Sequence, residues 1–292
     1  MARAVRAPGQ DKAGDGRLGK GGHGMSTSFL LQGKHAVVYG AGGSIGAAVA
    51  REFASHGAEV FLSGRTAASV EAVAKQIEAA GGRAHADVVD ALDSAAVEEY
   101  CNSVVQQTGS LDIEFNATGP RTSEYANGKP VGDLPVEEFM VPVDTVLKAN
   151  FITASAAARH MLRQGSGVII FLTGSPAQPH TPVSAPIGAA FGAIENLTRH
   201  LAIDLSPAGV RVVCVRTSAN PDSRTIQDLT DGMAKMMNIT SDQAKANLAA
   251  STLLKVSPRT TDTAFAAALV ASDLARMMTG TVLNASAGVV PD

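Results

Sequence analysis

The stretch "HAVVYGAGGSIGAAVAREFASHG", residues 35–57, joins a short apolar run to a glycine-rich turn and an alanine-rich segment. An apolar run of this length, followed by such a turn, is typical of a buried strand that leads into a helix. Gly40 can supply the tight turn, and Gly46 lets the helix pack close to the sheet. The free N–H groups and the dipole at the start of that helix favour a phosphate, so we expect a nucleotide site here.

Apolar runs and helical segments alternate along the rest of the chain. Buried strands are predicted at 35–40, 58–64, 111–117, 167–174 and 209–215, and helices at 44–56, 67–80, 93–107, 137–163 and 188–206. A further strand, the third of the chain, is expected to end at Asp87. Continuous apolar strands that alternate with helices indicate a parallel sheet covered on both faces. We therefore predict an α/β fold, a Rossmann-type doubly wound parallel sheet of about seven strands.

Two segments fit neither a strand nor a helix. They are 118–135 and 216–241, and both follow the carboxyl end of a predicted strand. Ligands of open parallel sheets bind at that edge, so both segments are candidate substrate lids. The run "MAKMM" at 233–237 fits either a lid helix packed on the core or an apolar wall for a substrate.

The composition excludes several classes of protein. The formal net charge of −3 gives no reason to expect a nucleic-acid partner, and no apolar run approaches the roughly 18 residues that span a membrane. Cys101 and Cys214 lie far apart in apolar contexts, so we expect neither a metal site nor a disulfide framework. This cysteine usage fits a protein of the reducing cytoplasm. Residues 1–24 are glycine-rich and nearly free of large apolar side chains, so we expect a disordered tail or upstream segment. One domain over 25–292, with Met25 as the native start, is the prediction for the rest.

Two polar residues at the ends of predicted strands bear on the cofactor. An acidic residue after the second strand would bind the ribose hydroxyls of NAD, but Arg65 stands there and can face a 2′-phosphate. This predicts a preference for NADP(H) over NAD(H), unless Arg65 is only a solvated surface residue. Asp87, at the end of the third strand, could accept a hydrogen bond from the adenine amine, or it is an ordinary turn or capping residue.

Several motifs in order make the chain resemble the short-chain dehydrogenase/reductase family over residues 30–290. "YGAGGSIG" resembles the family's TGxxxGxG turn, "NATG" its NNAG, and "GVIIFLTGS" the strand that ends at its catalytic serine. "MTGTVLNASAG" at 278–288 resembles its last strand and turn. The resemblance implies nucleotide contacts from Gly40, Gly42, Ser44, Ile45, Gly46, Arg65, Asp87, Val88, Asn116, Ala117 and Thr118. It also implies a homodimer or homotetramer built from the long helices on either side of the fifth strand.

The family's chemistry is hydride transfer between a nicotinamide cofactor and a carbonyl or alcohol. In the family a tyrosine moves the proton, and a lysine four residues later lowers its pKa and holds the nicotinamide ribose. Here Ile187 stands at the tyrosine and Phe191 at the lysine, and neither can carry a proton. Ser44 also replaces the second glycine of the turn, and "RTSANPD" stands where the family usually has Pro-Gly.

Three hypotheses follow from the missing pair. The first is an NADP(H)-dependent oxidoreductase with altered proton chemistry, which acts on a small carbonyl, imine or activated alkene. Its candidate catalytic residues are Ser175, Asn150, Thr173, His180 and Tyr125. The second is an inactive protein that binds NADP or a partner, and the third is a non-redox isomerase or cyclase. The retained turn favours the first and third hypotheses, and the apolar replacements favour the second.

Overall fold

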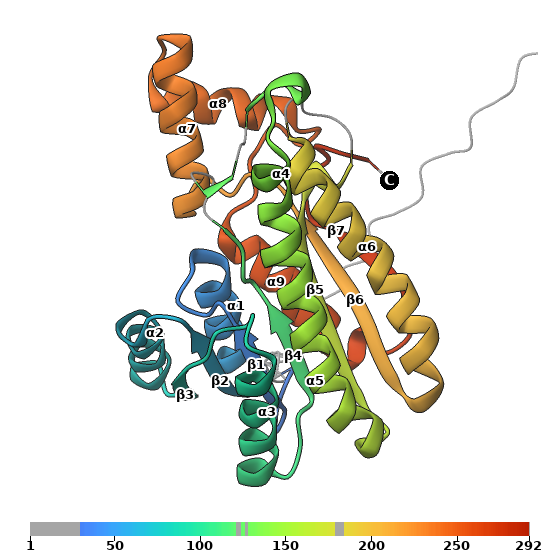
Figure 1. The fold of residues 1–292 in the computed structure, drawn as a ribbon. Coiled ribbons are helices and arrows are strands. Elements are labelled where there is room, and N and C mark those ends of the chain that lie inside the picture. The colour runs from blue at the N-terminus through green and yellow to red at the C-terminus, as the bar shows by residue number, and fades with distance from the viewer. Residues whose placement is uncertain (1–29, 121–123, 126–127, 179–183, 292) are drawn as a thin grey trace, which may run out of the picture.

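The computed structural model describes residues 30–120, 124–125, 128–178 and 184–291. At its centre is a seven-stranded parallel sheet (Figure 1). The strands are β1 (His35–Tyr39), β2 (Glu59–Gly64), β3 (Arg83–Val88), β4 (Ile113–Asn116), β5 (Gly167–Gly174), β6 (Val210–Thr217) and β7 (Thr281–Asn284). Their order is β3-β2-β1-β4-β5-β6-β7, and every neighbouring pair is parallel. The predicted doubly wound α/β fold is confirmed.

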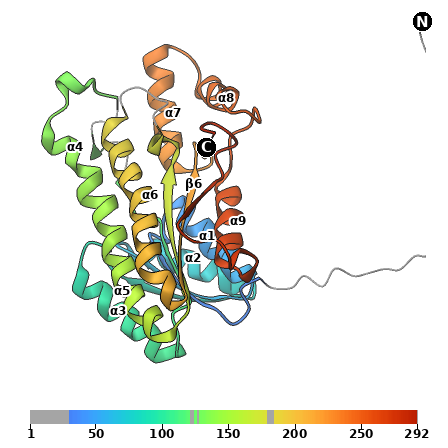
Figure 2. The same cartoon turned by 90° about the vertical axis from the view of Figure 1, so that its right-hand side faces the viewer.

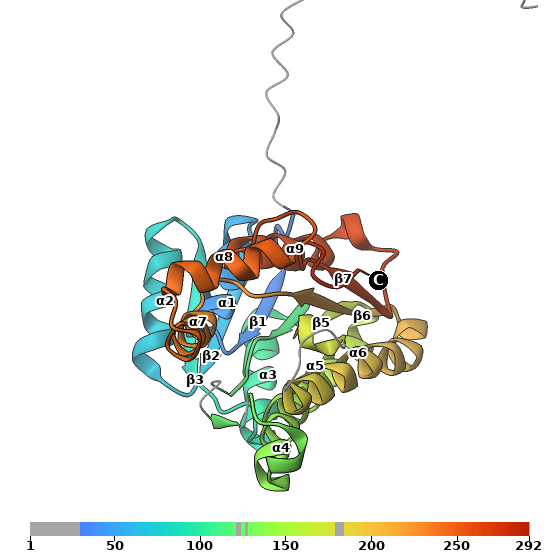
Figure 3. The same cartoon turned by 90° about the horizontal axis from the view of Figure 1, so that it is seen from above.

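Helices cover both faces of the sheet (Figure 3). One face packs against α1 (Ser44–Ser55), α2 (Ala67–Ala79) and α9 (Thr260–Ala271). The other packs against α3 (Ser94–Thr108), α5 (Lys148–Gln164) and α6 (Ala185–Leu205). Each face contributes its own apolar cluster, so the central strands are buried on both sides, as their continuous apolar runs predict.

The single helix predicted at 137–163 is wrong in one respect, because the structure divides it. It consists of α4 (Val136–Pro142), a π-helical segment (Val143–Leu147) and α5. Pro142 has no N–H to donate, and the Thr145 hydroxyl donates to the carbonyl oxygen of Val141 at 2.6 Å. Both effects disturb the regular ladder of helix hydrogen bonds where the segment changes its winding.

The structure also differs from the prediction for 216–241, because most of this segment is helical. Its helix is α7 (Arg224–Met237), which Ser223 caps by accepting a hydrogen bond from the N–H of Ile226. α7 packs on α8 (Ser241–Ser251), and both stand beyond the carboxyl edge of the sheet (Figures 1 and 2). The run "MAKMM" is therefore helical, but it is not packed on the core, because Met236 and Met237 are 81% and 54% exposed.

The short helical turns lie in the connections. They are Val131–Asp133 before α4, Ser175–Ala177 after β5, Ser206–Ala208 before β6 and Asp273–Ala275 after α9. Within the described part of the chain, every helix is too short or too polar to span a bilayer.

Candidate functional site

The glycine-rich turn between β1 and α1 is shaped by close backbone contacts. Gly40 has a φ of +70°, and a Cβ on it would lie 2.9 Å from the carbonyl of Ala117. A Cβ on Gly46 would lie 2.3 Å from the carbonyl oxygen of Gly40. A side chain at either position would push apart the turn, α1 and the end of β4, so both glycines are structurally required.

The start of α1 is open to an anion. Gly43 occupies the capping position, no side chain caps the helix, and its first turn contains no acidic residue. Such N–H groups, together with the helix dipole, favour a phosphate. The Ser44 hydroxyl lies at the same place, where it accepts a hydrogen bond from the N–H of Arg224 at 3.2 Å. The turn therefore fits the diphosphate of a dinucleotide.

Arg65 and Asp87 lie at the same edge of the sheet, at the carboxyl ends of the neighbouring strands β2 and β3. Arg65 is exposed immediately after β2, and Asp87 is exposed on β3, where it pairs in register with Ser63. Val88 beside it is an apolar side chain that is 61% exposed. A cation and an apolar surface at this position suit a nucleotide.

The end of β4 is held by the side chain of Asn116. Its amide nitrogen donates to the Thr153 hydroxyl on α5 at 2.9 Å. Its amide oxygen accepts from the N–H of Thr118 at 2.8 Å and from the Thr118 hydroxyl at 2.5 Å. The N–H of Ala117 donates to the carbonyl oxygen of Tyr39. These bonds fix the loop after β4 against the glycine-rich turn.

Asn150 lies one turn before Thr153 on α5 and is 1% exposed. Its amide nitrogen donates to the carbonyl oxygen of Val146, four residues earlier, at 2.8 Å. Its amide oxygen has no hydrogen-bond partner among the described residues. A buried amide oxygen in this state is a natural acceptor for an ordered water molecule.

The two polar candidates near the end of β5 have different surroundings. The Thr173 hydroxyl is buried, donates to Glu195 on α6 at 3.1 Å and lies 3.3 Å from the Cys214 sulfur. Ser175 follows β5 in a short helical turn and is 8% exposed. Among the described residues the Ser175 hydroxyl makes no hydrogen bond, whereas the Thr173 hydroxyl is held by Glu195.

Apolar side chains of α6 cover the end of β5. Ile187 is 8% exposed, and Phe191 is half-buried one turn later. A Cβ on Gly174 would lie 3.1 Å from the ring of Phe191, so the ring covers the last residue of the strand. The positions at which the resemblance implies a tyrosine and a lysine therefore form an apolar surface.

The remaining candidates lie on the loops. Tyr125 is half-buried, packs against the apolar cluster on the α5 side of the sheet, and burial raises its pKa to about 12. His180 lies outside the described residues. The described residues contain no group of three or more His, Cys, Asp or Glu side chains that could hold a metal ion. Cys101 and Cys214 are buried and free, and burial raises the pKa of each thiol to about 12.

A buried ion pair below the end of β5 escaped the sequence analysis. Arg216 at the end of β6 is 1% exposed and holds Glu195 through two hydrogen bonds of 2.7 Å, from Nε to Oε1 and from Nη2 to Oε2. The bidentate geometry joins α6 to β6, and Glu195 in turn accepts from Thr173 on β5. The sequence does contain a signal for this pair, because Glu195 and Arg216 each stand within an apolar pattern. A charged side chain at such a position is buried only when it is paired.

Glu114 is a second buried acid that the sequence analysis did not single out. It lies in the middle of β4, is fully buried, and neither carboxyl oxygen has a hydrogen-bond partner among the described residues. Burial raises its pKa to about 8, against a smaller opposing influence of the Thr153 hydroxyl. The carboxyl group is therefore mostly neutral at pH 7.

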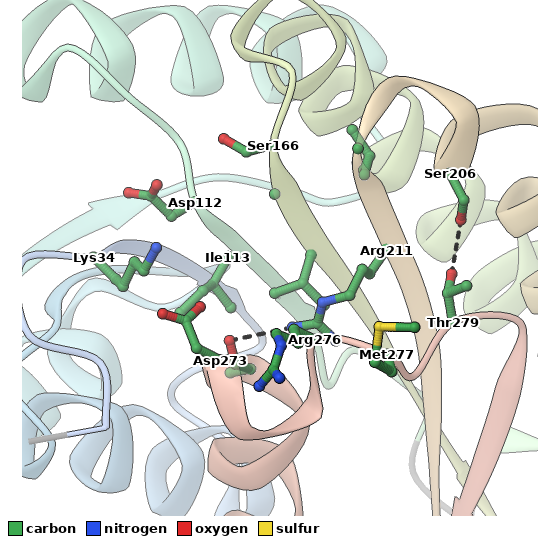
Figure 4. Close-up of a pocket in the computed structure, with 15 residues that line it drawn as sticks. Lys34, Asp112, Ile113, Ser166, Ser206, Arg211, Asp273, Arg276, Met277 and Thr279 are labelled. Atoms are coloured by element: carbon green, nitrogen blue, oxygen red, sulfur yellow. Dashed lines mark hydrogen bonds between the residues drawn. The ribbon is translucent and has the colours of Figure 1, made fainter.

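A cavity of about 390 Å³ lies at the opposite, amino edge of the sheet (Figure 4). It is lined by the first residues of β4, β5 and β6 and by Lys34, Asp112 and Arg211. The Arg211 guanidinium donates to the carbonyl oxygens of Val270 at 2.8 Å and Met278 at 3.2 Å, so it holds the end of α9. The candidate residues above lie at the other edge, and this cavity has no part in their site.

Comparison with known proteins decides the family. The family described as short chain dehydrogenase matches residues 34–228. An uncharacterised oxidoreductase of Methylorubrum extorquens is 32% identical over 260 residues, which cover 89% of this chain and 98% of that protein. The chain belongs to the short-chain dehydrogenase family.

Other known proteins agree with this chain in sequence or in fold. Gluconate 5-dehydrogenase of Gluconobacter oxydans is 32% identical over 63% of this chain and 70% of its own. A dehydrogenase/reductase structure from Sinorhizobium meliloti is 30% identical, with a TM-score of 0.75 over 90% of this chain and 98% of that one. An actinorhodin polyketide ketoreductase structure with NADPH shares the fold, with a TM-score of 0.81 at 20% identity over 88% and 97% of the two chains.

Membership of this family of oxidoreductases implies a nicotinamide cofactor. The residues present fit one, because the start of α1 is uncapped and the turn before it is closed by glycines. The short-chain dehydrogenase fold thus places the predicted nucleotide contacts at one edge of the sheet. Ser175, Ile187 and Phe191 lie at the same edge, at the end of β5 and the start of α6.

Proposed function

We propose that the protein is an NADP(H)-dependent oxidoreductase that acts on a small carbonyl compound, an imine or an activated alkene. The observation that carries this proposal is the uncapped start of α1 inside an intact glycine-rich turn. Exposed Arg65 after β2 supports the phosphorylated cofactor, because no acidic residue stands there to bind a free ribose.

The bound cofactor supplies a hydride at the carboxyl edge of the sheet. Ser175 donates a hydrogen bond to the oxygen or nitrogen of the substrate, and Asn150 offers a buried oxygen to a water molecule behind it. Ile187 and Phe191 carry no proton, so the proton comes from water or from a loop side chain, with Tyr125 and His180 as candidates. Burial raises the pKa of Tyr125 to about 12, which makes its phenol a weaker acid than an ordinary tyrosine, so its surroundings do not favour Tyr125 as the proton donor.

The apolar surface made by Ile187 and Phe191 favours particular acceptors. A simple ketone accumulates negative charge on oxygen as the hydride arrives, and a nearby acid stabilises that charge. An iminium ion or an electron-poor alkene needs less of this assistance. We therefore expect higher activity on activated alkenes and cyclic imines than on unactivated ketones.

A second candidate function is a protein that binds NADP(H) or a partner without catalysis. It is favoured by the Phe191 ring on Gly174 and by the burial of Ile187, which fill the positions of the catalytic pair. NADPH oxidation on a panel of alkenes, imines and ketones separates the two. Tight NADPH binding with no turnover on any of the panel would favour the binding protein.

The first experiment is a calorimetric titration of the full chain with NADPH and with NADH. Micromolar affinity for NADPH and much weaker affinity for NADH are expected. Failure to bind either cofactor would contradict both candidate functions that use it.

Arg65→Glu tests the preference for NADP(H). Reversing the charge beside a 2′-phosphate should weaken NADPH binding by about tenfold or more, because a charge-assisted pair is replaced by repulsion. NADH affinity should change little. Arg276→Glu is the matched control, since Arg276 is exposed at the opposite edge of the sheet. Unchanged NADPH affinity in Arg65→Glu would remove the basis for the preference.

A further inference from the structure

The first turn of α7 is bonded directly to the glycine-rich turn. The N–H of Arg224, the first residue of α7, donates to the hydroxyl of Ser44, the first residue of α1, across 180 positions of sequence. Figure 1 shows the lower end of α7 above the loop that enters α1. Two helices therefore begin at one point, and the Ser44 side chain joins them.

The start of α7 is also anchored from behind. The buried Ser223 hydroxyl donates to the carbonyl oxygen of Asn220 at 2.8 Å, and the Asn220 amide donates to the carbonyl oxygen of Pro258 at 3.1 Å. Asp222 accepts from the N–H of Thr260 at 3.0 Å and from its hydroxyl at 2.6 Å. These bonds tie the entry of α7 to the entry of α9, so the contact with Ser44 is part of a built junction.

The body of α7 is held much less firmly than its start. Along the helix Thr230 and Ala234 are buried, whereas Met236 and Met237 are 81% and 54% exposed. The helix packs on α8, which has one buried residue of its own, Ala244. A helix with few buried contacts opens locally at a low free-energy cost, so a bond at its first residue can decide how often it opens.

The Ser44 hydroxyl can serve two partners at once. Its oxygen accepts from Arg224, and its own hydrogen remains available for an acceptor in front of α1, where the uncapped N–H groups favour a phosphate. A hydroxyl that accepts one hydrogen bond becomes a better donor in the next, because the two bonds polarise each other. A glycine at this position, which the family motif has, offers neither bond.

We propose that Ser44 is a positioning residue that couples occupancy of the cofactor site to the docking of α7. The proposal rests on the proposed NADP(H) binding. A cofactor phosphate oxygen that accepts from Ser44 strengthens the bond between Ser44 and Arg224, and α7 held in this way slows the release of the cofactor.

Ser44→Ala in the full chain tests this coupling, because it keeps the Cβ and removes both hydrogen bonds. In the unchanged protein, NADPH should reduce hydrogen exchange of the amides of 224–237. In Ser44→Ala, that protection should be largely lost, and NADPH should dissociate about tenfold faster in a stopped-flow displacement experiment. Ser44→Thr keeps the hydroxyl and should retain both properties.

Thr225→Ala is the matched control, since Thr225 is exposed on the same turn of α7. It should leave the NADPH release rate and the protection unchanged, and thermal unfolding without NADPH checks that all variants fold. Equal protection of 224–237 by NADPH in Ser44→Ala and in the unchanged protein would overturn the coupling while leaving cofactor binding intact. Absence of NADPH binding in the unchanged protein, measured by calorimetry, would overturn the proposed function as well.

Discussion

Glu114 and Glu195 are both buried glutamates, but their surroundings differ. Glu195 is held by two hydrogen bonds from Arg216 and one from Thr173, so its charge is compensated. Glu114 faces the Thr153 hydroxyl, the Tyr39 hydroxyl and the Cys101 thiol, none of which carries a compensating charge. A buried carboxylate without a cation is unfavourable, so Glu114 retains its proton.

Retention of this proton makes the stability of the protein depend on pH. Glu114 has a pKa of about 8 in the folded chain, against an ordinary value of 4.5. Between these values the folded state binds a proton that the unfolded state has lost. The contribution of Glu114 to the free energy of unfolding is therefore greatest below about pH 4.5. It is lost as the pH rises through 8, at up to about 1.4 kcal/mol per pH unit.

Glu114→Gln should remove this contribution. Its free energy of unfolding, measured with urea between pH 5 and pH 8.5, should fall less with rising pH than that of the unchanged protein. Glu99→Gln is the control, because Glu99 is exposed on α3. If Glu114→Gln and the unchanged protein show the same pH dependence, Glu114 is not the group responsible.

At the scale of elements, the pair of Glu195 and Arg216 joins α6, β5 and β6 below the candidate substrate site. Glu195→Gln would remove the carboxylate that accepts two hydrogen bonds from the buried Arg216 guanidinium. Removing one partner of a buried ion pair typically costs about 3–5 kcal/mol. We expect a clear fall in the free energy of unfolding by urea, with any loss of activity following the loss of folded protein.

Thr173→Val separates the hydroxyl from the ion pair. It removes one hydrogen bond to Glu195 and keeps the shape of the side chain, so a loss of only about 1 kcal/mol is expected. Turnover of Thr173→Val close to that of the unchanged protein would show that Thr173 is structural. A large loss of turnover at full stability would instead return Thr173 to the catalytic residues.

The sequence predicted individual elements well where the cause was local. β5 is found at its predicted bounds, and α3 begins after Asp93, which caps it through the N–H groups of Ala95 and Ala96. The division of the helix at Pro142 was missed, and the helix after Ser223 was predicted only as one of two interpretations of residues 233–237. The first depends on how a π-helical segment accommodates the proline, and the second follows a run of turn-forming residues that hid it.

The contacts of the candidate site were harder to predict than its helices and strands. The glycine-rich turn could be predicted because its motif is local, although its close contact with Ala117 after β4 is not. The pairing of Glu195 with Arg216 and the bond from Arg224 to Ser44 connect residues 21 and 180 positions apart. Such contacts follow from the packing of the sheet and have no local pattern, so only the structure could reveal them.

At the scale of the whole molecule, the outer faces of α5 and α6 carry exposed apolar side chains. Phe151 on α5 is 53% exposed, and Ile203 on α6 is 72% exposed. Burial of such side chains is favourable by roughly 25 cal/mol for each square ångström of apolar surface. We propose that these helices form the interface of a homodimer or homotetramer.

Size-exclusion chromatography with light scattering tests this assembly. The protein should have a mass of two or four times 29.8 kDa, and Phe151→Glu should shift it toward the monomer. Met236→Glu is the control, because Met236 is also an exposed apolar residue but lies on α7. A mass of 29.8 kDa for the unchanged protein would contradict the proposed interface.

The packing of α9 against α1 has a consequence for how the protein is made. Ala264, Ala267 and Ala268 of α9 lie in the same buried cluster as Val49 and Ala50 of α1, more than 200 residues earlier in the chain. During synthesis, α1 emerges from the ribosome long before the helix that covers it. Its apolar face must remain exposed, or be shielded by a chaperone, until residues 260–271 have been translated. The nucleotide turn is thus made more than 200 residues before the helix that completes its support.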